Sequence, residues 1–235
     1  MPTLKRIGHK GADLIAPGNT LASFDAALAA GVDMVEFDVL TEHRDGTGRL
    51  VLAHDFEAAA RREPVTLEEG LAHFAQDAWE GIELDVDLKT TGYEHRVVEA
   101  LREYELSERA LISTMEEESL RVVRAAAPEI RLGWSVPKLR RDYLANAFTR
   151  VPALVGAQYM RTVLPGQAAR AIRAGRIDAV MSHWALVTPR LARAVEQAGG
   201  ELYVWTVDDA TRIAKLDALG VTGIITNDPR LFATA

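Results

Sequence analysis

Ionisable and apolar residues alternate in two short segments of the sequence, 34–40 and 82–89. The first segment carries Glu36 and Asp38, and the second carries a charge at every second position, in the order Glu83, Asp85, Asp87 and Lys89. Successive side chains of a β-strand point to opposite faces, so the charges of each segment share one face. A buried face of this kind is costly in free energy unless its charges are paired or bound to a metal ion.

The charges nearest the carboxyl ends of the two segments are candidates for a metal site. If the segments are adjacent parallel strands, about 4.8 Å apart, Glu36, Asp38 and Asp87 can converge on one cation. Oxygen ligands suit Ca2+ or Mg2+, and the absence of cysteine excludes sulfur ligands. The alternative is an internal network of ion pairs, which is the interpretation we favour for Glu83 and Asp85.

Two histidines could flank this acidic cluster, because His9 and His54 each follow a short apolar run. A single histidine near a strand end is more often a structural hydrogen-bonding residue than a catalyst. A pair on one face of the same cluster can instead act as a general base and a general acid. We therefore predict acid–base catalysis by His9 and His54, with the division of roles left open.

Short β-branched runs alternate along the chain with longer helical patterns, as in repeated βα units. The predicted strands are 5–9, 34–40, 82–89, 110–113, 131–136, 177–182, 201–207 and 223–226. The predicted helices include 20–30, 67–78, 93–105, 116–126, 138–150, 189–198 and 209–219. Eight strands, each followed by a helix or by the chain end, predict a (β/α)8 TIM barrel with its active site at the carboxyl ends of the strands.

One domain over residues 1–235 is expected, because no linker, low-complexity tract or block of charge divides the chain. The segment 151–176 is the least regular, since Pro152, Pro165 and Gly166 are expected to break it and an extra helix is expected before the sixth strand. An open doubly wound sheet is the main rival architecture. The chain lacks the glycine-rich phosphate loop that usually follows the first strand of such a sheet.

Composition argues against several partners. A net charge of −7 does not suit a nucleic-acid surface, which needs clustered lysine and arginine. No run of about 18 apolar residues occurs, so no membrane span is predicted. The first residues do not read as a signal peptide, so the prediction is a cytoplasmic protein without stable membrane insertion. The oligomeric state cannot be read from the sequence.

Motifs in a fixed order resemble those of the glycerophosphodiester phosphodiesterase family. In the first half of the chain they are Gly8-His9-Lys10-Gly11, Pro17-Gly18-Asn19-Thr20, Glu36-Phe37-Asp38, His54-Asp55 and Asp87-Leu88-Lys89. In the second half they are Val204-Trp205-Thr206-Val207-Asp208 and the Gly-Val-Thr-Gly-Ile-Ile-Thr-Asn-Asp-Pro segment at 220–229. The resemblance covers nearly the whole chain and implies a TIM barrel of the phospholipase-C-like phosphodiesterase type.

The resemblance also implies an activity, namely metal-dependent hydrolysis of a small glycerophosphodiester to glycerol phosphate and an alcohol. By this resemblance, one divalent cation, Ca2+ or Mg2+, is held by three carboxylates, those of Glu36, Asp38 and Asp87. The histidine pair supplies acid–base catalysis, through His9 and His54. Phosphate contacts are assigned to Lys10 and Lys89, and Trp205 either lies in the substrate pocket or fills the core.

His54 is implied to lie on a hairpin-like excursion after the second strand, a placement that the Asp45-Gly46 turn signal supports. The chain departs from the family pattern in four places. Lys10 stands where arginine is usual, Gly18 replaces a glutamate, and Asp87 replaces a glutamate. Only residues 56–65 separate His54-Asp55 from the next helix, where the family usually carries a long insertion. The substrate pocket is therefore expected to be more open.

Three alternatives remain at this stage. A lysophospholipase D or sphingomyelinase-D-like phosphodiesterase suits the Asp87-x-Lys89 spacing and the missing insertion. A metal-dependent barrel lyase or aldolase explains the carboxylates but leaves the His9 and His54 pair less well explained. A non-catalytic binding barrel explains Lys10 and Gly18 as signs of a decayed site.

Overall fold

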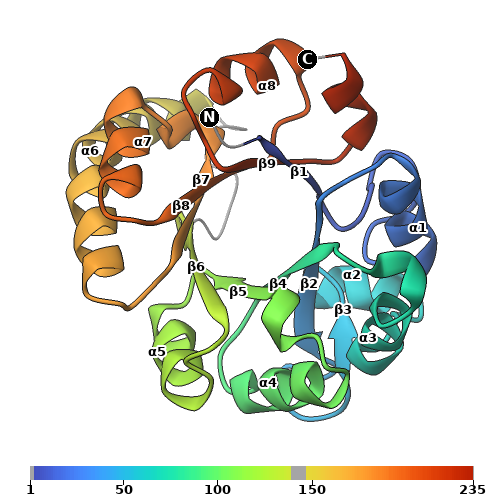
Figure 1. Ribbon diagram of the computed structural model, residues 1–235. Helices are drawn as coiled ribbons and strands as arrows, with labels where there is room; N and C mark the ends of the chain where they lie inside the picture. The colour runs from blue at the N-terminus through green and yellow to red at the C-terminus, as the bar shows by residue number, and fades with distance from the viewer. Residues whose placement is uncertain (1–2, 139–146, 235) are drawn as a thin grey trace.

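The computed structural model describes residues 3–138 and 147–234 of the chain, and its centre is a closed ring of eight parallel strands (Figure 1). These strands are β1 (Lys5–Gly8), β2 (Met34–Thr41), β4 (Glu83–Leu88), β5 (Ala110–Thr114), β6 (Arg131–Val136), β7 (Ala179–His183), β8 (Glu201–Trp205) and β9 (Gly223–Thr226). The ring closes because β1 pairs in parallel with both β2 and β9. The predicted (β/α)8 barrel and its eight strands are confirmed.

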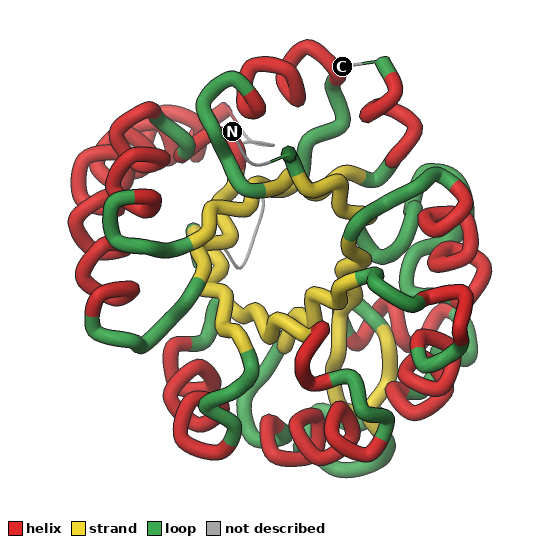
Figure 2. Tube along the Cα trace, in the orientation of Figure 1, coloured by secondary structure: helices red, strands yellow, loops and turns green. Residues whose placement is uncertain are grey.

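A ring of helices surrounds the strands (Figure 2). The α-helices of the outer layer are α1 (Leu21–Ala29), α3 (Leu67–Phe74), α4 (Glu94–Glu103), α5 (Glu117–Ala126), α6 (Ala147–Arg173), α7 (Pro189–Glu196) and α8 (Ala210–Asp217). Short 3-10 helices lie at Asp77–Trp79, Ser107–Arg109, Trp184–Leu186 and Pro229–Ala233. Side-chain caps fix where several α-helices begin, since the side chains of Thr20, Thr66, Thr188 and Asp209 each accept a main-chain N–H bond.

A short hairpin interrupts the alternation after β2. Strand β3 (Leu50–Leu52) runs antiparallel to the end of β2, with Thr41 opposite Leu50. Gly46 supplies the turn with a φ of +87°, so the expected hairpin-like excursion is present. The helix α2 (Phe56–Arg61) follows directly, and Asp55 caps it by accepting a 2.7 Å hydrogen bond from the Ala58 N–H.

The segment that precedes β7 differs from the prediction. Residues 147–173 form one helix, α6, which continues through Pro152, Pro165 and Gly166 instead of breaking there. A proline inside a helix costs about 3 kcal/mol because it removes a main-chain donor. The buried face of α6, which includes Leu164 and Ala168, offsets that cost by packing on the barrel. Of the predicted helix 138–150, residues 139–146 lie outside the described residues.

The core has two parts. The larger part lies between the strands and the helices, and in it the stacked rings of Phe37 and Phe74 pack against Phe24. The smaller part fills the middle of the barrel with Ile7, Met34, Leu111, Ala179, Met181, Tyr203 and Ile225. The barrel is therefore packed rather than hollow, and charged side chains are left to its two ends. No helix within residues 3–138 and 147–234 combines the length and the apolar character needed to cross a membrane.

Candidate active site

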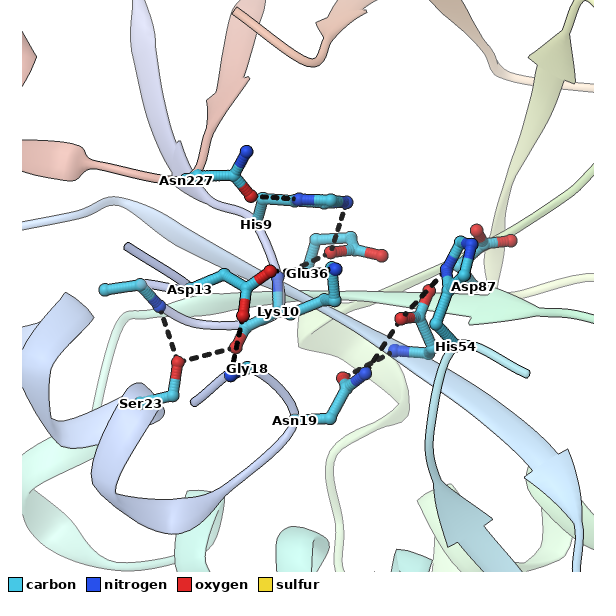
Figure 3. Close-up of polar contacts among 12 residues, drawn as sticks. His9, Lys10, Asp13, Gly18, Asn19, Ser23, Glu36, His54, Asp87 and Asn227 are labelled. Atoms are coloured by element: carbon cyan, nitrogen blue, oxygen red, sulfur yellow. Dashed lines mark hydrogen bonds and ion pairs between the residues drawn. The ribbon is translucent and has the colours of Figure 1, made fainter. Parts of the chain in front are cut away.

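Three carboxylates meet where β2 and β4 lie side by side in the barrel wall (Figure 3). The register of the two strands places Asp38 opposite Asp87, and Glu36 lies two residues earlier on β2. One carboxylate oxygen from each of Glu36, Asp38 and Asp87 lies within 4.8 Å of the others. Glu36 and Asp38 are buried, and Asp87 is partly exposed. The structure thus brings together the three residues that the sequence singled out as metal ligands.

Lys89 is the cation within this cluster. Its Nζ forms an ion pair with Asp38 and lies 2.5 Å from Oδ2 of Asp87. Burial alone would lower the pKa of Lys89, but the charges of Asp38, Asp87 and Glu36 raise it well above its usual value. The ammonium group is therefore charged at neutral pH and available to an anionic substrate.

Negative charge is in excess at this end of the barrel. Burial, and then repulsion from Asp38, raise the pKa of Glu36 well above its usual range. The pKa of Asp87 is also raised, first by burial and then by Asp38, against the opposing effect of Lys89. Burial alone would raise the pKa of Asp38, but Lys89 and His54 hold it well below its usual value. A divalent cation would relieve this repulsion, and buried oxygen ligands are the donor set that Ca2+ and Mg2+ prefer.

Asp38 is held in place by Asn19 and faces His54. The Asn19 side-chain amide donates a 2.8 Å hydrogen bond to Oδ2 of Asp38, and its oxygen accepts from the Asp38 N–H at 3.1 Å. On the open side of the cluster, Nδ1 of His54 lies 3.4 Å from the same carboxylate oxygen. The His54 side chain is 55% exposed, so its ring is accessible to a substrate.

His9 follows β1 and its ring is fixed by a chain of hydrogen bonds. Nδ1 lies 2.6 Å from Oδ1 of Asn227, whose side-chain N–H donates to Asp208 at 2.7 Å. The Asp208 contact fixes the amide orientation, so the Asn227 oxygen accepts and Nδ1 of His9 carries the hydrogen. Nε2 faces the carboxylates, 3.8 Å from Glu36 (Figure 3). Burial, and then the charge of Lys10, lower the pKa of His9 to about 4, so the ring is neutral at pH 7.

The turn after β1 binds the acidic cluster to helix α1. The Lys10 N–H donates a 2.7 Å hydrogen bond to Oε2 of Glu36, and the Lys10 carbonyl accepts from the Ser23 hydroxyl at 2.7 Å. Gly11 has a φ of +86°, and a Cβ there would lie 2.5 Å from Oγ of Ser23. Only glycine allows this approach, which explains the glycine that follows His9-Lys10.

Asp13 occupies the space beside Gly18. Its carboxylate forms an ion pair with Lys10 at 2.9 Å and accepts a 2.8 Å hydrogen bond from the Gly18 N–H. A Cβ at position 18 would lie 2.5 Å from Oδ1 of Asp13. The departures at positions 10 and 18 are therefore linked through Asp13, whose carboxylate pairs with Lys10 and fills the space beside Gly18.

Trp205 ends β8 and faces the barrel interior. Its Nε1–H donates a 2.8 Å hydrogen bond to the carbonyl of Met181, and its ring lies edge-on to His183 at 5.2 Å. The side chain also packs on the apolar residues in the middle of the barrel and is partly exposed. Trp205 therefore covers the core and borders the open end of the barrel at the same time.

The other acidic residues of β4 behave differently from each other. Glu83 forms ion pairs with Lys5 and Arg131 at the opposite end of the barrel, as the sequence predicted. Asp85 is buried and has no ion pair within the described part of the chain, so its assignment to that network is wrong. Burial raises the pKa of Asp85 to about 8, and a hydrogen bond with Ser113 offsets only part of that rise.

Sequence reasoning missed three residues that support the site, namely Asn19, Asn227 and Asp13. Asn19 and Asn227 lie in motifs that had been recognised, the first just before helix α1 and the second just after β9, and their signal was an amide side chain within those motifs. Asp13 had no such signal, because its contact with Gly18 depends on how the loop folds.

Comparison with known proteins is consistent along the whole chain. The model of the glycerophosphoryl diester phosphodiesterase family matches residues 9–61 and 65–231. A glycerophosphodiester phosphodiesterase from Caldanaerobacter subterraneus subsp. tengcongensis is 27% identical over 259 residues, which cover 95% of this chain and 93% of that protein. A glycerophosphodiester phosphodiesterase from Arabidopsis thaliana is 28% identical and is matched over 70% of its length, with 95% of this chain covered.

Solved structures share the fold. A glycerophosphoryl diester phosphodiesterase structure from Silicibacter pomeroyi aligns with a TM-score of 0.76 and 20% identity, covering all of this chain and 95% of that one. A phosphodiesterase from Oleispira antarctica, determined in complex with the product sn-glycerol-3-phosphate, aligns with a TM-score of 0.70 and 20% identity. That alignment covers 98% of this chain and 96% of the other.

Proposed function

Because this chain belongs to the glycerophosphoryl diester phosphodiesterase family, we propose that it hydrolyses glycerophosphodiesters with one divalent cation and two histidines. The products are glycerol phosphate and an alcohol. One observation carries the proposal: two histidines lie beside the three carboxylates of β2 and β4 at the mouth of the barrel. One histidine follows β1 and the other follows β3. The membership also identifies the chain as a phosphodiesterase, which argues against the lyase or aldolase alternative.

The residues present fit a divalent cation. Glu36, Asp38 and Asp87 would hold it through oxygen atoms, and their mutual repulsion supports a cation of charge two. Bound there, a Ca2+ or Mg2+ ion supplies positive charge for the phosphate oxygens as negative charge develops on them. Since Lys89 touches two of the same carboxylates, we expect its ammonium to turn from them toward the phosphate when substrate and ion are present.

The two histidines divide the proton transfers. The hydrogen on Nδ1 of His9 is used by Asn227, so Nε2 carries a lone pair and serves as the general base toward the attacking hydroxyl. The attacking group is water or a neighbouring hydroxyl of the substrate. His54 lies across the cluster, with Nδ1 beside Asp38 and its ring exposed, and serves as the general acid that protonates the leaving alkoxide.

Positive side chains bind and orient the phosphate. Lys89 pairs with Asp38 inside the carboxylate cluster, and Lys10 pairs with Asp13 beside it. A lysine presents a point charge, so Lys10 orients the phosphate less rigidly than the forked guanidinium of an arginine would. Trp205 forms part of the wall against which the substrate packs.

The test uses protein stripped of metal with a chelator and then given glycerophosphocholine, with and without added Ca2+ or Mg2+. We expect release of glycerol phosphate only when metal is added, and a loss of about 10²–10⁴-fold in kcat for both His9→Ala and His54→Ala. His95→Ala is the matched control, because His95 lies exposed on the outer helix α4. Hydrolysis that is unaffected by metal removal or by either histidine change contradicts the proposal.

A second candidate is hydrolysis of a lysophospholipid, and one observation favours it. Leu14 and Ile15 are 63% and 39% exposed on the loop that follows His9, where an acyl chain could contact them. These two adjacent apolar side chains offer a small surface that an acyl chain could cover. Release of a free alcohol from a lysophospholipid would favour this candidate if Leu14→Ser slows it. The same substitution should leave the rate with glycerophosphocholine unchanged.

A further inference from the structure

A cavity of about 340 Å3 opens on one side of the proposed active site. Its walls come from the loop after β1, the end of β3 and helix α2 with the residues that follow it. His54 and Lys10 line both the cavity and the cluster of carboxylates, so the two spaces are continuous. A volume of this size lies within the range of about 300–1,000 Å3 that small-molecule sites have.

Positive charge predominates around this cavity. Lys10, Arg61 and Arg62 line it, and Asp13 is the carboxylate among the lining residues. Asp13 is already paired with Lys10. The two arginines at the far wall therefore determine the charge that a ligand meets beyond His54.

Neither arginine is neutralised by a buried carboxylate. Arg61 pairs with Glu57 at 2.5 Å, but both side chains are more than 70% exposed, and such pairs contribute little. Arg62 reaches across the cavity and donates a hydrogen bond to the carbonyl of Gly18. Among residues 3–138 and 147–234, no carboxylate forms an ion pair with Arg62. Neither guanidinium group is held by a buried carboxylate, so both can exchange their present partners for an anionic ligand.

The short connection after β3 creates this arrangement. Asp55 caps α2, and this short helix ends at Arg61, so Arg61 and Arg62 stand at its end and beside Gly18. Gly18 has no side chain to fill the cavity, and Asp13 takes the space next to it. The same features that depart from the family pattern thus leave a cationic hollow beside His54.

We propose that this hollow is a subsite for a leaving alcohol that carries a further negative charge, such as a second phosphate. The inference depends on the proposed hydrolysis, because it assigns the half of the diester that leaves past His54. Guanidinium groups bind phosphate through paired N–H donors, and they repel the quaternary ammonium of choline. The preferred substrates are therefore diesters of phosphorylated polyols rather than of choline.

Two diesters that differ by one glycerophosphoryl group, and so by one phosphate charge, provide the test, namely glycerophosphoglycerol and bis(glycerophospho)glycerol. Binding is measured by calorimetry, with Ca2+ or Mg2+ present, to the His9→Ala protein, which does not turn the diesters over. The larger diester offers two equivalent ends, which accounts for a twofold advantage. We expect at least about a fivefold preference for it, because two partly exposed charge pairs add to the binding.

The double variant Arg61→Gln, Arg62→Gln, made in the same protein, is expected to reduce this preference to about twofold. Arg193→Gln, on the exposed side of α7, is the matched control and should retain the full preference. Raising the NaCl concentration should also reduce the preference in the parent protein but not in the double variant. Equal binding of the two diesters by the parent, or a preference that the double variant retains, overturns the inference.

Turnover of glycerophosphoglycerol by the unmodified protein is measured separately. Absence of turnover refutes the proposed hydrolysis, whereas the binding preference is decided by calorimetry alone. The two failures are therefore distinguishable.

Discussion

Charged side chains occupy both ends of the barrel interior, and the two ends differ in how those charges are balanced. At the amino end, the first residues of four strands form a network, namely Lys5, Glu83, Arg131 and Glu201. Two cations there face two carboxylates. Burial alone would raise the pKa of Glu83, but Lys5 and Arg131 lower it. This network satisfies its own charges.

At the carboxyl end the balance is different, because three carboxylates share the ammonium group of Lys89. The pKa values of Glu36 and Asp87 are raised, which is the opposite of what happens to Glu83. Strand β4 thus contributes to a self-neutralised network at one end and, beside β2, to an unbalanced cluster at the other. The difference teaches that residual charge, rather than the mere presence of buried charges, marks the functional end of this barrel.

The largest expected effect comes from removing charge at the unbalanced end. Asp38→Asn should lower kcat/KM for glycerophosphocholine by about a thousandfold, because the ion and His54 both lose the carboxylate they share. The fold should persist, since the substitution also reduces repulsion among buried carboxylates. Steady-state kinetics and circular dichroism on the same preparation check this. Activity within tenfold of the unmodified protein would contradict the functional role of the carboxyl-end cluster.

The self-neutralised end should respond in the opposite way. Glu83→Gln should lower the free energy of unfolding by ~1–2 kcal/mol, because Lys5 and Arg131 lose their shared carboxylate in a partly buried place. kcat/KM should stay within about twofold of the unmodified value, since the apolar middle of the barrel separates Glu83 from the site. Urea unfolding and kinetics measure the two quantities. An unchanged unfolding free energy together with lost activity would reverse the roles of the two ends.

Asp85 lies between the two ends and belongs to neither. Its folded-state pKa is about 8 against an ordinary value of 3.8, so the folded protein holds a proton between these pH values that the unfolded chain releases. Its contribution to stability is therefore present at pH 4 and is lost as the pH rises to 8. Asp85→Asn does not titrate, so its advantage over the unmodified protein should grow by about 3–4 kcal/mol from pH 5 to pH 8.

Thermal unfolding of metal-free protein at both pH values measures this. Asp87→Asn is the comparison variant on the same strand, and it should also abolish metal binding, which Asp85→Asn should not. A stability difference between Asp85→Asn and the unmodified protein that is the same at pH 5 and pH 8 would contradict the account of Asp85.

The smallest effect concerns the rim of the carboxyl end. Asp13→Ala should raise KM by about two- to fivefold and leave kcat nearly unchanged, because Lys10 loses the partner that positions it. Gly18→Glu alone should destabilise the protein, since its Cβ would lie 2.5 Å from Oδ1 of Asp13. The double variant should recover KM but only part of the stability, because it moves the carboxylate from position 13 to position 18 while the new Cβ still lies 2.8 Å from Cβ of Lys10. If the double variant does not recover KM, a carboxylate at this place does not position Lys10 for the substrate.

The strands and their charged faces could be predicted because a period of two is a local property. The alternation at 34–40 and 82–89 identifies β2 and β4, and the parallel register then brings Asp38 beside Asp87. The turn at Gly46 is also local, and it supported the hairpin-like excursion that the family resemblance implied. Helix α2 was not predicted, although Asp55 and the alanines that follow it are the signal of a capped helix.

Features that depend on contacts distant in sequence could not be predicted. Asn227 fixes the tautomer of His9 from 218 positions away, and no local pattern links the two. Helix α6 passes through Pro165 because burial on the barrel outweighs the local preference of proline. Asp85 was wrongly assigned to the ion-pair network, because alternation predicts which face of the strand a side chain occupies. It does not predict whether an oppositely charged residue lies at the same height along the barrel.

Calorimetric titration of the metal-free protein with Ca2+ and with Mg2+ tests the central claim most directly. We expect one ion per chain, lost in Asp38→Asn and Asp87→Asn and retained in Glu83→Gln, because the carboxyl end alone carries uncompensated negative charge. Absence of binding to the unmodified protein, or binding that survives both changes at the carboxyl end, would contradict the account.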